Sequence, residues 1–300
     1  MKAAVLIGFG GVDQLEVREV PEPTVHDGEL KVRVVATSIN PIDWKLREGM
    51  KRPGLPLDLP AILGRDAAGE VVEVGAGVTR FRVGARVTGL VMAGYAQYVV
   101  AKQEAWADVP AAMNLADAAA VPLVGLTGAE LVDDGVKPRA GDTVLVTGAV
   151  GNVGRAAVFA ARARGAKVWA GVRSAQRTAA TQLGVDGVVV LDDDHANAAV
   201  PMFDAIADTV GAATTQKLLD KVRRGGVIAS VVSEPDTHDR GVEARHVWAR
   251  PDHERLAALV RAVADGVLVI PIAKRFSLAQ IREAQQAAQA GAGGKVFVEM

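Results

Sequence analysis

The pattern of hydrophobic and polar positions changes near residue 110. Before that point, short apolar runs alternate with Gly, Pro and Asp, a spacing typical of strands joined by turns. The predicted strands are Ala3–Ile7, Leu15–Glu19, Leu30–Ala36, Glu70–Val74, Arg86–Thr88 and Ala96–Val100. We therefore predict a partly antiparallel, barrel-like domain in the first third of the chain.

From about Leu115, predicted strands and helices alternate. This alternation is typical of a doubly wound parallel sheet with helices between its strands, so the predicted fold class is α/β. The strands of this sheet are predicted at 143–147, 167–172, 187–191, 203–208 and 226–232.

The chain after this sheet is predicted to contain both helices and strands. Its elements are a helix at 252–265, a strand at Val267–Pro271, a helix at Leu278–Ala290 and a strand at Lys295–Glu299. The elements after 265 are too few to enclose a core of their own, so we expect them to rejoin the first domain. This gives a barrel-like domain over 1–120 and 266–300, and a Rossmann domain over 121–265.

A glycine-rich turn follows the strand at 143–147. Without side chains, Gly148 lets the chain reverse, Gly151 lets the backbone approach a pyrophosphate, and Gly154 lets the next helix pack against its strand. The helix at 153–164 would point its free N-terminal amides at an anion. Strand, turn, helix and second strand in this order predict a dinucleotide site rather than a purely structural βαβ unit.

The residues after the second strand indicate which dinucleotide is bound. An NAD site offers Asp or Glu about 20 residues after the last glycine, but here Arg173 and Ser174 stand there. With Arg177, they can donate charge-assisted hydrogen bonds to a 2′-phosphate, which predicts NADPH. The alternative is that the arginines only solvate a surface helix. The acidic run Asp192–Asp194 is interpreted as a solvated loop.

The composition narrows the functional class. The 300 residues are 50% apolar, carry a net charge of −1 and contain no basic block or membrane-length apolar run. We expect a cytoplasmic globular protein with a small-molecule substrate, and neither nucleic acid nor a membrane as partner. Cysteine is absent, and the five histidines lack paired ligand spacing. No metal site is therefore predicted.

Several segments carry a family resemblance. They are an Asn-Pro-x-Asp segment at Ser38–Gly49, a GxDxxGxVxxVG signature at Leu63–Gly75, and Gly94–Tyr98, Phe203–Gly211 and Gly294–Val298. Together they resemble the zinc-free quinone oxidoreductase branch of the medium-chain dehydrogenase/reductase superfamily over nearly the whole chain. Two features depart from relatives. The chain is short between Val87 and Tyr95, and Gly64–Asp66 lacks the histidine of the Gly-His-Glu segment in zinc-dependent members.

The resemblance implies a homodimeric NADPH-dependent reductase of quinones or α,β-unsaturated carbonyl compounds, with a GroES-like, partly open barrel beside the Rossmann domain. It implies that Asn40 is catalytic and faces the nicotinamide. The second candidate catalytic residue, Tyr95, is predicted from the residues themselves as a proton donor. The whole set of predicted cofactor-binding residues is Asn40, Thr127, Gly148, Ala149, Val150, Gly151, Asn152, Val153, Gly154, Arg173, Ser174, Arg177, Asp208, Thr209, Val210, Val231, Val232, Ser233, Val247 and Lys295.

Structural alternatives stay open for the residues of the first domain. Asn40 is also a common Asn-Pro turn residue, Tyr95 could be a packed tyrosine, and Asp43 with Arg65 and Asp66 could form a structural polar cluster. The Tyr98–Lys102 segment has the Tyr-x-x-x-Lys spacing of short-chain dehydrogenases. On a strand its two side chains would lie roughly 13 Å apart, so they could not cooperate.

Two functional hypotheses follow. The first is hydride transfer from NADPH to a quinone or enone, which asks little of the protein side chains because conjugation spreads the incoming charge. The second is a protein that binds NADPH as a sensor with little turnover.

Overall fold

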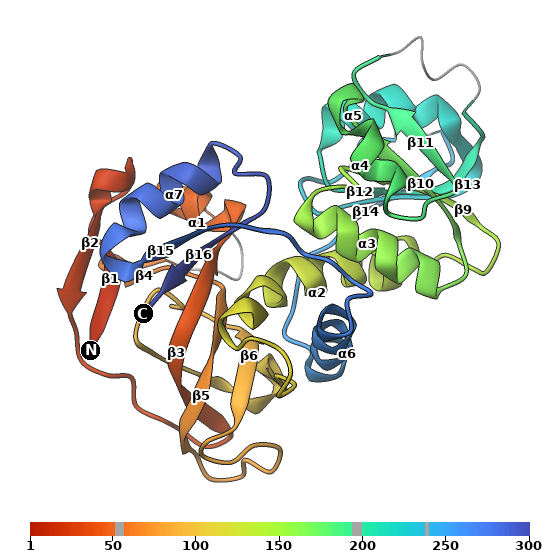
Figure 1. The fold of residues 1–300 in the computed structure, drawn as a ribbon. Helices are drawn as coiled ribbons and strands as arrows, with labels where there is room; N and C mark the ends of the chain where they lie inside the picture. Colours follow the sequence, from red (N-terminus) through yellow and green to blue (C-terminus); the bar gives the residue numbers. More distant parts are fainter. Residues whose placement is uncertain (52–56, 194–199, 238–239) are drawn as a thin grey trace. The chain divides into compact units, whose positions relative to one another are not determined.

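The computed structural model describes residues 1–51, 57–193, 200–237 and 240–300. The chain forms two compact units, Met1–Leu123 with Pro251–Met300, and Val124–Arg250 (Figure 1). Among the described residues, no helix is both long and apolar enough to cross a membrane.

The first unit contains two sheets. The smaller one has the order β2-β1-β4 and is antiparallel. The larger one has the order β15-β16-β3-β5-β6-β8, with β7 also paired to β3, and only its β15–β16 pair is parallel. The strands of the two sheets together are β1 Lys2–Leu6, β2 Leu15–Glu19, β3 Glu29–Ile39, β4 Ala61–Ile62, β5 Asp66–Val74, β6 Arg86–Leu90, β7 Tyr98–Lys102, β8 Trp106–Asp108, β15 Ile272–Ser277 and β16 Lys295–Glu299.

Alternation along β3 shows why this sheet encloses a core. Leu30, Val32, Val34 and Ala36 are buried, while Arg33 and Val35 between the last three of them are exposed. Side chains two apart lie on the same face of a strand, so the inward set packs with residues of β5, β6 and β8 in one apolar cluster. The helices of this unit are α1 Pro41–Arg47, α6 His253–Ala264 and α7 Ile281–Gln289.

The second unit contains the predicted doubly wound sheet. Its strands are all parallel in the order β11-β10-β9-β12-β13-β14. Val144, Leu145 and Val146 of β9 are fully buried, as expected for a central strand covered on both faces. The strands are β9 Thr143–Thr147, β10 Lys167–Val172, β11 Gly187–Val190, β12 Phe203–Asp208, β13 Val222–Ser230 and β14 Glu243–His246, and the helices are α3 Asn152–Ala163, α4 Arg177–Thr181 and α5 Ala212–Leu218. Helix α2, Pro122–Glu130, spans the boundary between the two units.

Two predictions about the last part of the chain differ from the structure. The strand predicted at Val267–Pro271 is wrong, because the strand is β15 at Ile272–Ser277, and Val267 and Val269 of the apolar run are 69% and 56% exposed. The helix expected in the Rossmann domain at 252–265 is α6, which belongs to the first unit. It contacts β8, and His253 Nδ1 lies 2.6 Å from the carbonyl oxygen of Trp106.

Candidate functional site

The glycine turn in the second unit is shaped for a close backbone approach. Gly148 has a φ of +63°, in the left-handed region that glycine reaches without strain. A Cβ at Gly154 would lie 2.1 Å from the carbonyl oxygen of Gly148, so the start of α3 packs directly on the turn. Gly151 is exposed and stands immediately before α3, where the helix offers free amides. The geometry fits a pyrophosphate at this point.

Asp208, at the end of β12, holds the strand ends around the turn. Its buried carboxylate accepts hydrogen bonds from the hydroxyl of Thr147 at 2.7 Å and the hydroxyl of Ser230 at 2.7 Å. It also accepts bonds from the amides of Val210 and Gly211. Three neighbouring parallel strands, β9, β12 and β13, are therefore tied together at their carboxyl ends. In the structure the side chain of Asp208 positions these loops, and its predicted contact with the cofactor stays a prediction.

Two exposed valines lie at the strand ends, Val210 beside the glycine turn and Val232 beside Gly211. Val210 is 49% exposed and Val232 is 40% exposed. A Cβ at Gly148 would lie 3.2 Å from a methyl of Val210, and a Cβ at Gly211 would lie 3.4 Å from a methyl of Val232. An anion cradle beside exposed apolar side chains suits a ligand that combines phosphates with flat rings.

The strand that precedes Arg173 and Ser174 ends beside the loop that contains Asp192. Arg173, Ser174 and Arg177 are all exposed, as a 2′-phosphate contact requires. Ser174 is already bonded, because its amide donates to Asp192 Oδ1 at 2.7 Å and its hydroxyl donates to Asp192 Oδ2 at 3.1 Å. The sequence interpretation treated Asp192 as part of a solvated loop and missed this contact. The signal in the sequence was that Asp192 directly follows the strand predicted at 187–191, which in the structure is β11 and pairs with β10. Asp194 lies outside the described residues.

The other predicted cofactor residues of the second unit lie at various depths. Val231 and Ser233 are half-buried directly after β13, and Val247 is half-buried directly after β14, with its amide donating to the carbonyl of Ser230. Thr127 is half-buried in α2. Asn40, Tyr95 and Lys295 belong to the first unit.

A buried polar cluster in the first unit is built on Asp66, at the start of β5. Lys295 Nζ lies 2.7 Å from Asn40 Oδ1 and 3.1 Å from Asp66 Oδ2, and the Asn40 amide donates to the same Asp66 oxygen at 2.7 Å. The hydroxyl of Ser38 also donates to Asp66 Oδ2, and the amide of Leu123 donates to Oδ1. All of these side chains except that of Leu123 are buried. The oxygen and the nitrogen of the Asn40 side-chain amide are thus both hydrogen-bonded to buried groups of the protein.

Asp43 and Tyr95 form a second buried pair. The hydroxyl of Tyr95 donates to Asp43 Oδ2 at 2.7 Å, and the backbone amide of Asn40 donates to the same oxygen at 2.8 Å. Burial raises the pKa of Asp43 to about 6, and burial together with the neighbouring Asp43 raises the pKa of Tyr95 well above its usual 10. Tyr95 is fully buried in an apolar cluster. These contacts favour the packed-tyrosine interpretation over a proton donor.

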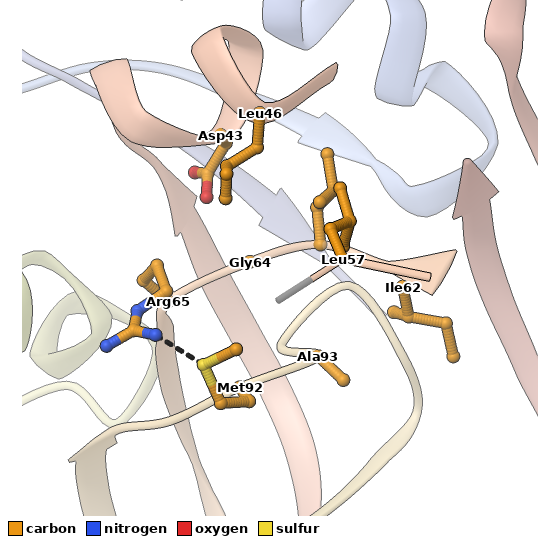
Figure 2. Close-up of a pocket in the computed structure, with 9 residues that line it drawn as sticks. Asp43, Leu46, Leu57, Ile62, Gly64, Arg65, Met92 and Ala93 are labelled. Atoms are coloured by element: carbon orange, nitrogen blue, oxygen red, sulfur yellow. Dashed lines mark hydrogen bonds between the residues drawn. The ribbon is translucent and has the colours of Figure 1, made fainter. Parts of the chain in front are cut away.

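Asp43 also lines a small pocket (Figure 2). The pocket has a volume of about 20 Å³, room for about one water molecule. Figure 2 shows Arg65 directed toward Met92, to which it is hydrogen-bonded. Burial lowers the pKa of Arg65 from its usual value. The remaining lining residues are Leu46, Leu57, Ile62, Leu63, Gly64 and Ala93. The pocket is too small to hold a quinone by itself.

Comparisons with known proteins identify the family. Models of an alcohol dehydrogenase GroES-like domain and of a zinc-binding dehydrogenase match residues 26–111 and 183–298. The chain is 38% identical to a chloroplast envelope quinone oxidoreductase homolog of Arabidopsis thaliana, over 60% of this chain and 57% of that protein. It is 31% identical to a 2-haloacrylate reductase of Burkholderia sp, over 95% of this chain and 94% of the relative. The quinone oxidoreductase of Coxiella burnetii superposes with a TM-score of 0.89 at 25% identity, covering 100% of this chain and 99% of that one.

The chain belongs to the quinone oxidoreductase branch of the medium-chain dehydrogenase/reductase superfamily. This membership confirms the predicted fold class, a parallel Rossmann sheet together with a GroES-like domain. The chain spans little more than half of the length of the Arabidopsis relative.

A zinc ion, which part of this superfamily uses, does not fit the residues at Gly64–Asp66. Arg65 stands in place of the histidine of zinc-dependent members, and Lys295 already brings a positive charge to the carboxylate of Asp66. Within the described part of the chain, no group of three or more His, Asp or Glu side chains could hold a metal. The sequence contains no cysteine to complete such a set.

Proposed function

We propose that the chain is a zinc-independent reductase that transfers hydride from NADPH to a quinone or an α,β-unsaturated carbonyl compound. The observation that carries this proposal is the glycine turn, which combines a close-packed Gly154, an exposed Gly151 and two exposed arginines after the next strand. The relatives support the acceptor class, because one is named a quinone oxidoreductase homolog and another a 2-haloacrylate reductase.

The residues of the chain would bind and orient rather than react. Bound NADPH supplies the hydride. Gly148–Gly154 and the start of α3 would hold the pyrophosphate, and Val210 and Val232 would border the rings. Asp208 keeps these loops in place. In the first unit, Asp66 and Lys295 fix the orientation of Asn40 by hydrogen bonds to both ends of its amide. Positioning of this kind contributes to the rate without an acid or base on the protein.

The acceptor is tested by following the loss of NADPH absorbance with a set of quinones and enones and the purified full chain. We expect turnover with at least one member of either class. NADPH binding without turnover of any acceptor would contradict the proposal and favour the sensor hypothesis. The second hypothesis has some support in the structure, since the polar side chains around Asn40 are bonded to one another.

Cofactor preference is tested by Arg173→Ala. Because the guanidinium would pair with the 2′-phosphate, we expect NADPH binding to weaken about 10- to 100-fold, with little change for NADH. The matched control is Arg82→Ala, an exposed arginine in the first unit, which should change neither affinity. Equal weakening of both dinucleotides by Arg173→Ala would contradict the assignment. The homodimer and the cytoplasmic location expected from the sequence stay predictions.

A further inference from the structure

Asp192 stands where the 2′-phosphate of NADPH is expected to bind. Strands β10 and β11 are parallel, with Val172 paired to Val190, so the residues after each strand meet at one edge of the sheet. The amide of Leu191 donates to the carbonyl of Val172 at 2.8 Å and extends this contact past the strand ends. Asp192 therefore reaches Ser174, and its carboxylate accepts both of the hydrogen bonds that Ser174 can donate.

This carboxylate is charged at neutral pH. The hydrogen bonds from Ser174 lower the pKa of Asp192 from its usual value, and the positive charge of Arg173 acts in the same direction. A 2′-phosphate placed at Ser174 would lose both donors to Asp192 and would meet a like charge. A ribose 2′-hydroxyl would meet no such repulsion, because it can donate a hydrogen bond to a carboxylate oxygen.

We propose that Asp192 is a specificity-determining residue, whose Ser174-bound carboxylate opposes the 2′-phosphate and limits the preference for NADPH over NADH that Arg173 creates. The inference rests on the proposed dinucleotide-binding function. Arg173 attracts the phosphate and Asp192 repels it from the adjoining strand end. The chain should accordingly accept both dinucleotides, with a smaller preference than its arginines alone would give.

The test is binding of NADP⁺ and NAD⁺ to the full chain by isothermal titration calorimetry, before and after Asp192→Asn. An asparagine can still accept from the Ser174 amide, and its own NH₂ can donate to the Ser174 hydroxyl, so the loop geometry is kept. Removal of one charge at close range should tighten NADP⁺ about 10-fold, whereas NAD⁺ should change less than about 2-fold. Asp193→Asn is the matched control, since it removes the same charge one residue away.

The outcomes separate this inference from the proposed function. A selective gain in NADP⁺ affinity with Asp192→Asn, absent in Asp193→Asn, supports it. If both dinucleotides bind and the preference does not change, or if Asp193→Asn has the same effect, the inference is overturned while the proposed function stands. A parallel loss of both affinities would also overturn it, because the loop would then have only a structural role. If neither dinucleotide binds the wild-type chain, both proposals fail.

Discussion

A hydrogen bond between Asn40 and Lys295 joins the end of β3 to the start of β16. Both were predicted from motifs to serve the cofactor, and the structure brings them within 2.7 Å of each other although 255 residues separate them. The motifs single out both residues, and their role toward the cofactor stays a prediction. They could not show that Asp66 would take up the amide of Asn40 and the charge of Lys295, because that pairing depends on β16 lying beside β3 and β3 beside β5.

Asp43 is the residue whose burial should be measurable as a pH effect. One of its oxygens, Oδ1, is buried and has no hydrogen-bond partner among the described residues, while Oδ2 accepts from Tyr95 and Asn40. Burial raises its pKa from the ordinary 3.8 to about 6. The folded chain therefore holds this proton more tightly than the unfolded chain does, and protonation favours folding.

The sign of the effect follows from this raised pKa. The stabilisation is fully present below about pH 4, is lost as the pH rises through about 6, and is absent above that. Asp43→Asn cannot titrate, so the stability of the wild type relative to this variant should fall by about 3 kcal/mol between these limits. Urea unfolding at a series of pH values measures it. The control is Asp108→Asn, at an exposed position. If the free energy of unfolding depends on pH in the same way for the wild type and for Asp43→Asn, the effect is disproved.

At the scale of elements, the turn between β9 and α3 combines two demands on glycine that substitution can separate. A Cβ at Gly154 would collide with backbone, 2.1 Å from the carbonyl oxygen of Gly148 and 2.7 Å from Cα of Ala149. A Cβ at Gly151 would meet only that carbonyl oxygen, at 3.1 Å, and Gly151 is exposed. Gly154 thus allows the helix to pack on the strand, and Gly151 leaves the surface of the turn open for a ligand.

We therefore expect two alanine substitutions to affect different properties, one the stability and the other dinucleotide binding. Gly154→Ala should lower the free energy of unfolding by about 1–3 kcal/mol or more, since neither backbone segment can move aside cheaply. Gly151→Ala should change stability by less than about 1 kcal/mol and yet weaken dinucleotide binding at least about 10-fold, because the methyl group blocks the pyrophosphate. Thermal unfolding and calorimetric titration measure the two quantities. In the control Gly8→Ala, the new methyl meets only the flexible side chain of Gln14. Equal destabilisation by both turn variants would refute the division.

The elements themselves were predicted best where the local pattern is strong. The strands predicted at 143–147, 167–172 and 203–208 have the observed bounds of β9, β10 and β12, because buried parallel strands carry continuous apolar runs between turn residues. The apolar run at Val267–Pro271 was mistaken for a strand because sequence does not show exposure, and pairing with β16 begins only at Ile272. Short strands such as β4 and β8 carry too few residues for a periodic signal.

At the scale of the whole molecule, each unit contributes a different part of the proposed chemistry. The second unit contains the glycine turn and the selectivity residues, and the first contains the Asn40, Asp66 and Lys295 cluster. Family membership was predictable because its motifs lie in both units. The place of α6 was not, since an amphipathic helix after a Rossmann sheet can pack against either unit, and here contacts such as that between His253 and Trp106 join it to β8.

The buried ion pair between Asp66 and Lys295 predicts how the whole protein responds to metals. Lys295 supplies a covalently attached cation to the carboxylate of Asp66, at 3.1 Å. A second cation would be repelled, and breaking the pair would leave a buried charge uncompensated, which costs about 3–5 kcal/mol. We expect the purified full chain to contain less than about 0.1 zinc per chain by mass spectrometry and to keep its reductase activity in 1,10-phenanthroline. Stoichiometric zinc whose removal abolishes turnover would instead place a metal in the reaction and refute the zinc-independent mechanism.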